Sequence, residues 1–137
     1  MVIKNNGLIC KCGKAGCFER YASILSFKNR VIDRLNLSYD IPGKELRKII
    51  DDSQKQIQDI QSEYINDLAL GISNLINIFE PDCIIIGGGF TRYSKWLLKP
   101  LKQKLLNSEL LFNEREELII EPAKLGNEAG IIGASIL

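Results

Sequence analysis

Three of the four cysteines in this chain, Cys10, Cys12 and Cys17, lie close together in the stretch CKCGKAGC. Thiolates are common zinc ligands, and a structural zinc ion takes four ligands in a tetrahedron with Zn–S bonds of about 2.3 Å. Gly13 and Gly16 lie inside the stretch and let the backbone turn, so that several thiolates can face one ion. The spacing therefore predicts a metal site with three cysteine ligands.

Two other interpretations of these cysteines stay open. They are three reduced thiols on the surface, or two of them form a disulfide, which the reducing cytoplasm disfavours. Three ligands leave one coordination position for water or for a fourth protein ligand. The chain has no histidine to fill that position.

A second stretch with chemical potential is IIIGGGF, in which Gly87, Gly88 and Gly89 follow a short apolar run. Glycines between a strand and a helix allow a close approach of the backbone to a ligand, and the start of a helix favours anions. The pattern predicts either a ligand site or a tight turn. Phe90 is a candidate for the lining of that site and equally for the core.

Composition narrows the functional classes. The chain has 137 residues, 45% of them apolar and 26% charged, with a net charge of +1. These values are ordinary for one globular domain and give no reason to expect binding to nucleic acid or to a membrane surface. No apolar run approaches the roughly 20 residues of a membrane span, and no signal peptide precedes the cysteines. We expect a cytoplasmic protein.

The elements that position these stretches follow from hydrophobic periodicity. It predicts helices over residues 18–36, 44–53, 57–79 and 93–107, and a last helix that carries Ile131 and Ile132. Residues 83–86 and 118–120 predict two strands, the first of them buried on both faces, and Cys83 is then a buried thiol. A strand, a helix and a strand predict a parallel βαβ unit. The fold class is α/β with a thin sheet.

Three blocks of the sequence together resemble one protein family. CKCGKAGCFERYAS resembles the Cys-x-Cys-Gly-x-x-Gly-Cys-x-Glu signature of ROK proteins (repressor, open reading frame, kinase). LALGISNLINIFEPDCIIIGGG is similar to the family's long helix and the strand that ends in glycines, and AKLGNEAGIIGASIL to its C-terminal end. The resemblance covers all 137 residues.

The resemblance implies roles for the residues named above. Cys10, Cys12 and Cys17 match the thiolates that hold a structural zinc. Glu19 matches the glutamate that binds sugar hydroxyls, although a carboxylate favoured by a helix N-terminus would explain Glu19 alone. Gly87, Gly88, Gly89 and Phe90 match the nucleotide side. The implied fold is the C-terminal lobe of an actin-like (ribonuclease H-like) ATPase, with residues 1–20 as zinc loop, 21–80 as helical segment and 81–137 as nucleotide-side segment.

The implied function is ATP- and Mg²⁺-dependent phosphorylation of a hexose or N-acetylhexosamine by a homodimer. The alternative is the sugar-sensing part of a ROK transcriptional repressor. The family's fourth zinc ligand, a histidine, aligns just before Met1. The general base and the N-terminal phosphate loop also have no equivalent in this chain. We therefore expect the chain to be inactive as a kinase by itself, with no catalytic residue of its own.

Overall fold

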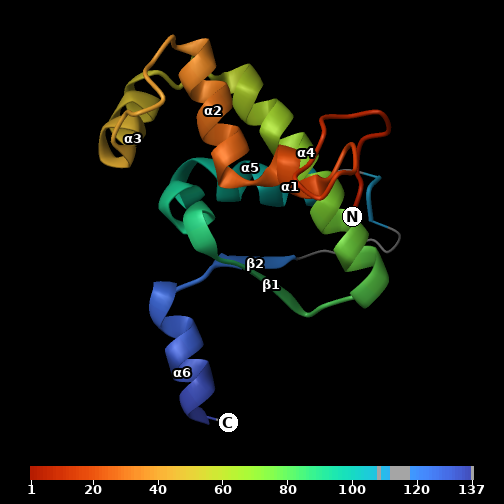
Figure 1. Cartoon of the computed structure of the whole chain (residues 1–137). Coiled ribbons are helices and arrows are strands. Elements are labelled where there is room, and N and C mark those ends of the chain that lie inside the picture. The colour runs from red at the N-terminus through yellow and green to blue at the C-terminus, as the bar shows by residue number, and fades with distance from the viewer. Residues whose placement is uncertain (108, 112–117, 137) are drawn as a thin grey trace.

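The computed structural model describes residues 1–107, 109–111 and 118–136. Its longest element is the helix α4 (Gln58–Phe79), which runs through the middle of the chain with α1, α2 and α5 beside it (Figure 1). Ile60, Tyr64, Leu68, Ile72 and Ile76 recur every three or four residues along α4, and all are buried. This apolar stripe confirms the long helix that the periodicity predicts.

The predicted helix over residues 18–36 is two helices, α1 (Phe18–Ala22) and α2 (Ile24–Arg34). Ser23 separates them in an extended conformation, and its hydroxyl accepts a hydrogen bond from the Ser26 N–H at 3.3 Å. A serine in this position caps the second helix, because its oxygen satisfies an N–H group that has no partner inside the helix. The prediction of one helix was wrong because this local bond competes with helix continuation.

Helices α3 (Gly43–Asp52) and α5 (Ser94–Leu106) complete the core. Both contribute fully buried leucines or isoleucines, and they pack with α2 and α4 around the aromatic pair Phe27 and Tyr64. The residues from these helices with no exposed surface are Phe27, Val31, Leu46, Ile50, Ala69, Leu97, Leu101 and Leu105. Among the described residues, these side chains belong to one hydrophobic core cluster, which Ile120 of the second predicted strand also joins.

The sheet consists of β1 (Cys83–Ile86) and β2 (Ile119–Pro122), which pair in parallel with Cys83 opposite Ile119. The 3₁₀ helix η1 (Gly88–Tyr93) and α5 connect them, so the predicted parallel βαβ unit is confirmed. The expectation that the first strand is buried on both faces was wrong. Ile85 is 67% exposed and the Cys83 thiol is exposed, because the described helices cover only one face of the sheet.

The chain ends in η2 (Gly126–Glu128) and α6 (Ala129–Ile136). This confirms the predicted last helix, which carries Ile131 and Ile132. Figure 1 shows α6 projecting away from the other helices, and Ile131 is 74% exposed. Within the residues that the structure describes, no helix combines the length and apolarity that a crossing of a bilayer requires.

Gly71 provides a test of the packing of α1 on α4. A Cβ at this position would lie 2.1 Å from Cε2 of Phe18, whereas a Cβ at Gly133 of α6 would meet no atom within 4 Å. Alanine normally stabilises an open helix position by about 0.5–1 kcal/mol relative to glycine. We expect Gly71→Ala to lower the free energy of unfolding in urea by about 1–3 kcal/mol, because the ring must move.

Gly133→Ala is the matched control and should unfold at or above the wild-type midpoint. Equal midpoints for Gly71→Ala and the wild type would contradict the observed close approach of α1 to α4.

Candidate functional site: a cysteine loop and a glycine turn

The cysteine loop is held in shape by backbone hydrogen bonds to the N-terminal segment. Val2 bridges Cys17 and Ile9 bridges Ala15 in antiparallel fashion. The Ile3 N–H donates to the Gly16 carbonyl at 2.8 Å, and the Gly16 N–H donates to the Leu8 carbonyl at 2.9 Å. The loop therefore folds back on residues 1–9 before α1 begins.

This fold brings the three predicted cysteines together. The sulfur atoms of Cys10, Cys12 and Cys17 all lie within 4.8 Å of one another, and those of Cys12 and Cys17 are 3.5 Å apart. Ligand sulfurs at about 2.3 Å from a tetrahedral zinc ion are about 3.8 Å apart, so small side-chain adjustments would suit this ion. Cys10 is buried, Cys17 is partly buried and Cys12 is exposed. The donor set fits zinc.

The protonation of the cluster is uneven. A hydrogen bond from the backbone of Lys14, together with bonds from the other two cysteines, lowers the pKa of Cys12 below its usual value. The hydrogen bond to Cys12, with burial as a second cause, raises the pKa of Cys17 to about 11. The Cys17 thiol thus gives up its proton less readily than the Cys12 thiol, and a hydrogen bond in which either sulfur can be the donor places one proton between them. A metal ion would take the place of that proton.

Glu19 lies beside the cluster in the first turn of α1. Its Oε2 accepts a hydrogen bond from the Cys10 thiol at 3.9 Å. Glu19 also lines a cavity of about 300 Å³ together with Lys11, Asn29 and Arg30. The predicted sugar-side carboxylate and the three predicted thiols are therefore neighbours in the structure.

The glycine turn forms a second cavity, of about 570 Å³. Gly87, Gly88 and Gly89 all line it, and Gly88 has a left-handed φ of 65°. Phe90, by contrast, is 5% exposed and belongs to the hydrophobic core, and it is absent from the described lining of this cavity. The structure groups the three glycines and separates them from the side chain of Phe90.

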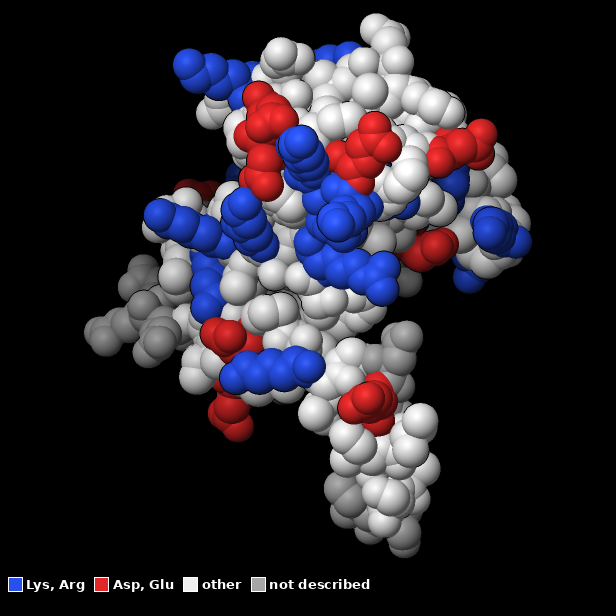
Figure 2. Space-filling view, turned by 90° about the vertical axis from the view of Figure 1, so that its left-hand side faces the viewer, with Lys and Arg blue, Asp and Glu red and all other residues white. Residues whose placement is uncertain are grey.

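Sequence reasoning missed Arg92 and Thr91, which also line this cavity. The Thr91 hydroxyl donates to the Gly88 carbonyl at 3.0 Å and so holds the turn, while Arg92 is an exposed cation. Figure 2 shows Lys and Arg side chains gathered across the middle of the face that lies on the left of Figure 1, with Asp and Glu around them. A cation soon after a glycine run was the signal available in the sequence.

The two cavities adjoin the same break between α1 and α2. Ser23 lines the cavity of Glu19, and the next residue, Ile24, packs on the glycine turn. A Cβ at Gly89 would lie 2.5 Å from Cγ2 of Ile24, so this close contact requires glycine. Gly89 therefore has a packing role in addition to its place in the cavity lining.

Gly16 and Gly13 offer a matched test of the loop. Both have positive φ, 78° and 83°, but a Cβ at Gly16 would lie 1.7 Å from the Lys4 carbonyl oxygen, while Gly13 has open space. We expect Gly16→Ala to weaken Zn²⁺ binding at least tenfold, because the loop must leave residues 1–4. Gly13→Ala should lower the stability of the loop only by the strain of a left-handed backbone, about 1–2 kcal/mol, because its side chain meets no other atom. Competition against a chromophoric chelator measures both, and equal losses would contradict this account.

Comparisons with known proteins find similarity along the whole chain. A sequence profile described as the ROK family matches residues 1–137. The glucokinase of Halalkalibacterium halodurans is 32% identical over 148 residues, covering 99% of this chain and 44% of the relative. The xylose repressor of Caldicellulosiruptor bescii is 27% identical, covering 91% of this chain and 34% of the repressor.

A solved structure is similar over the same region. The crystal structure of a ROK family glucokinase from Streptomyces griseus, in complex with glucose and AMPPNP, matches with a TM-score of 0.81 and 25% identity. The match covers 99% of this chain and 48% of that one. The chain thus spans less than half the length of these relatives. Since the family profile matches from the first residue to the last, this chain belongs to the ROK family.

Proposed function

We propose that this chain is the sugar-side and nucleotide-side half of a ROK sugar kinase, which transfers a phosphoryl group from ATP to a hexose. The observation that carries the proposal is the placement of Glu19 beside three convergent cysteine thiols, on the same chain as a glycine-lined cavity. The similarity to a glucokinase that binds glucose and AMPPNP supports it. The proposed fold is the C-terminal lobe of an actin-like ATPase.

Cys10, Cys12 and Cys17 would hold a zinc ion with a structural role. A bound zinc ion supplies rigidity here, because it ties both ends of a short loop to one point. That rigidity matters for Glu19, which comes two residues after Cys17 and lies in the first turn of α1. The metal would fix the position of the Glu19 carboxylate.

Glu19 would bind the sugar. A carboxylate accepts two hydrogen bonds from neighbouring hydroxyl groups, and bonds to an ionised group are stronger than neutral ones. The cavity that Glu19 lines, at about 300 Å³, is of the size of small-ligand sites. Lys11 and Asn29 on its wall offer further donors.

The glycine turn would bind the nucleotide, as ATP with Mg²⁺ in the complete enzyme. Gly87 and Gly88 let the backbone approach a phosphate or ribose, and Arg92 adds a cation on the wall of the same cavity. Phe90 would act from the core by supporting the turn. Transfer of a phosphoryl group depends mainly on positioning and on compensation of charge, which suits such a site.

The second candidate function is the sugar-sensing part of a ROK repressor, which the similarity to a xylose repressor supports. Such a sensor needs the loop and Glu19 but has no need of a phosphate site. The cavity at the glycine turn with Arg92 on its wall therefore favours the kinase. Because the chain is about half of its relatives in length, we expect no turnover from it alone, and the tests below measure binding.

Replacement of the sugar-side carboxylate tests the first half of the proposal. We expect Glu19→Gln, in the zinc-loaded chain, to weaken glucose binding about tenfold or more, since a charged acceptor is lost. Glu45→Gln, at an exposed position in the first turn of α3, is the control and should bind like the wild type. Chemical-shift titration with glucose and N-acetylglucosamine gives the affinities. Unchanged affinity in Glu19→Gln would remove Glu19 from the sugar site.

Replacement of Arg92 tests the nucleotide half and separates the two candidate functions. We expect the wild-type chain to bind Mg²⁺–AMPPNP and Arg92→Ala to bind it about tenfold more weakly, because a charge-assisted hydrogen bond is lost. Lys99→Ala removes an exposed cation of α5 outside the described cavity lining and should change little. Calorimetric titration measures all three. A wild-type chain that binds glucose but no nucleotide would favour the repressor.

A further inference from the structure

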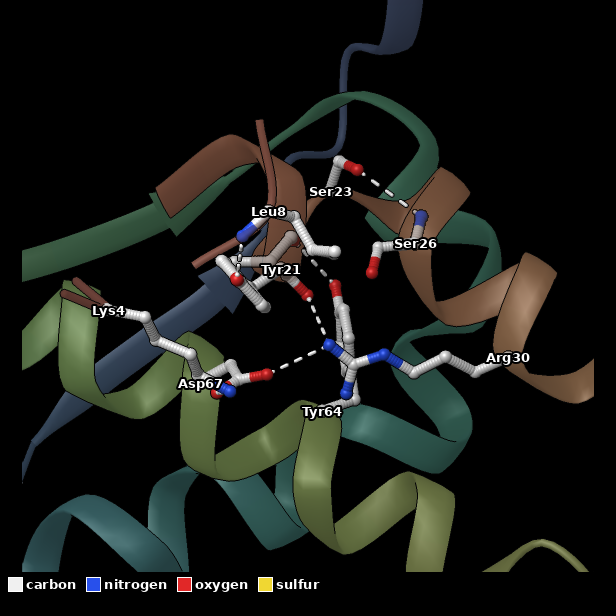
Figure 3. Close-up of polar contacts among 9 residues, drawn as sticks. Lys4, Leu8, Tyr21, Ser23, Ser26, Arg30, Tyr64 and Asp67 are labelled. Carbon is white, nitrogen blue, oxygen red and sulfur yellow. Dashed lines mark hydrogen bonds and ion pairs between the residues drawn. The ribbon is translucent and has the colours of Figure 1, made fainter. Parts of the chain in front are cut away.

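Asp67 is a buried carboxylate in the middle of α4. Its exposed fraction is 6%, and it is the single buried acidic residue among those that the structure describes. A buried charge is costly unless it is paired. Asp67 has two partners: the Lys4 ammonium lies 2.7 Å from Oδ1, and the Arg30 guanidinium lies 2.8 Å from Oδ2 (Figure 3).

The Lys4 partner belongs to the segment that shapes the cysteine loop. Its backbone N–H donates to the Gly16 carbonyl at 3.2 Å, directly before Cys17. Its ammonium also lies 4.4 Å from the centre of the Tyr21 ring. The ion pair with Asp67 therefore connects the N-terminal segment, on which the loop closes, to α4.

The Arg30 partner reaches the other end of the loop. Its guanidinium donates to the Tyr21 carbonyl at 3.4 Å, and the Tyr21 hydroxyl accepts a hydrogen bond from the Leu8 N–H at 2.6 Å. Figure 3 shows the Arg30 guanidinium between Asp67 and Tyr21. Tyr21 lies two residues after Glu19 on α1. The Asp67 carboxylate is therefore connected, through Lys4 and Arg30, to the segments before and after the three cysteines.

We propose that Asp67 is the positioning residue of this site: through Lys4 and Arg30 it fixes the cysteine loop and Glu19 on α4. As a consequence it raises the affinity of the loop for its metal ion. This consequence rests on the metal centre proposed above, whereas the fixing of the loop does not.

Asp59 provides a matched control on the same helix. It pairs with Arg34 of α2 through two hydrogen bonds, at 2.9 and 2.6 Å, so it also links α4 to α2. Its side chain is 56% exposed and has no bond to the cysteine loop. If Asp67 served only to join two helices, Asp59→Asn and Asp67→Asn would affect the loop equally.

The first measurement is amide hydrogen exchange in the full chain, because it measures the opening of the loop separately from the opening of the core. We expect Asp67→Asn and Lys4→Met to accelerate exchange at Leu8 and Gly16 about tenfold, with little change at the buried turns of α4. Lys4→Arg keeps the cation and should restore wild-type exchange. Asp59→Asn should leave both amides unchanged.

The second measurement is the Zn²⁺ dissociation constant, from competition with a chromophoric chelator. Loss of a residue that orients metal ligands typically weakens metal binding by about 10–100-fold. We expect this loss for Asp67→Asn and Lys4→Met, and a change within about twofold for Asp59→Asn and Lys4→Arg.

The outcomes separate the two proposals. If the wild type binds Zn²⁺ and Asp67→Asn keeps both its affinity and its slow exchange at Leu8 and Gly16, the role of Asp67 is refuted and the metal centre stands. If the wild type binds no Zn²⁺, the metal centre is refuted, and exchange at Leu8 and Gly16 alone decides the role of Asp67. Should Asp67→Asn fail to fold, Lys4→Met and Lys4→Arg carry the same test, since Lys4 is 43% exposed.

Discussion

Close contact at three glycines is the constraint on which both candidate sites depend. Gly16 lies against the Lys4 carbonyl, Gly71 against the Phe18 ring and Gly89 against Ile24. Any side chain at these positions would separate the cysteine loop from the N-terminal segment, α1 from α4, or the glycine turn from α2. The sites are thus held by backbone proximity that the smallest residue alone permits.

The break between α1 and α2 connects the two candidate sites. Ser23 ends the short helix that carries Glu19, and Ile24 begins the helix that packs on Gly89. The capped break at Ser23 therefore lies between the helix that carries Glu19 and the residue that packs on the glycine turn. A kinase that brings a sugar hydroxyl to a phosphate needs two such sites at a fixed separation, because proximity supplies much of its rate enhancement.

Sequence reasoning could find the elements and the cysteine cluster because their signals are local. Hydrophobic periodicity predicts a helix over residues 57–79, and short apolar runs predict strands at 83–86 and 118–120. Each of these signals lies within the element that it predicts. The spacing of Cys10, Cys12 and Cys17 indicates convergence because a short loop with two glycines cannot carry the thiols far apart. The parallel pairing followed from the helix between the two strands.

Long-range packing decided what the sequence alone could not. The exposure of Ile85 depends on which faces of the sheet the helices cover. A short apolar run has the same sequence pattern whether the helices cover one face of its strand or both. The burial of Phe90 and the exposure of Arg92 at the glycine turn depend on how η1 lies on the core. Asp67 reads as an ordinary polar position of a helix, and its meeting with Lys4, 63 positions earlier, exists only in the folded chain. Sequence by itself thus determined the local elements and the ligand types, whereas tertiary contact decided which charges are buried and what they hold in place.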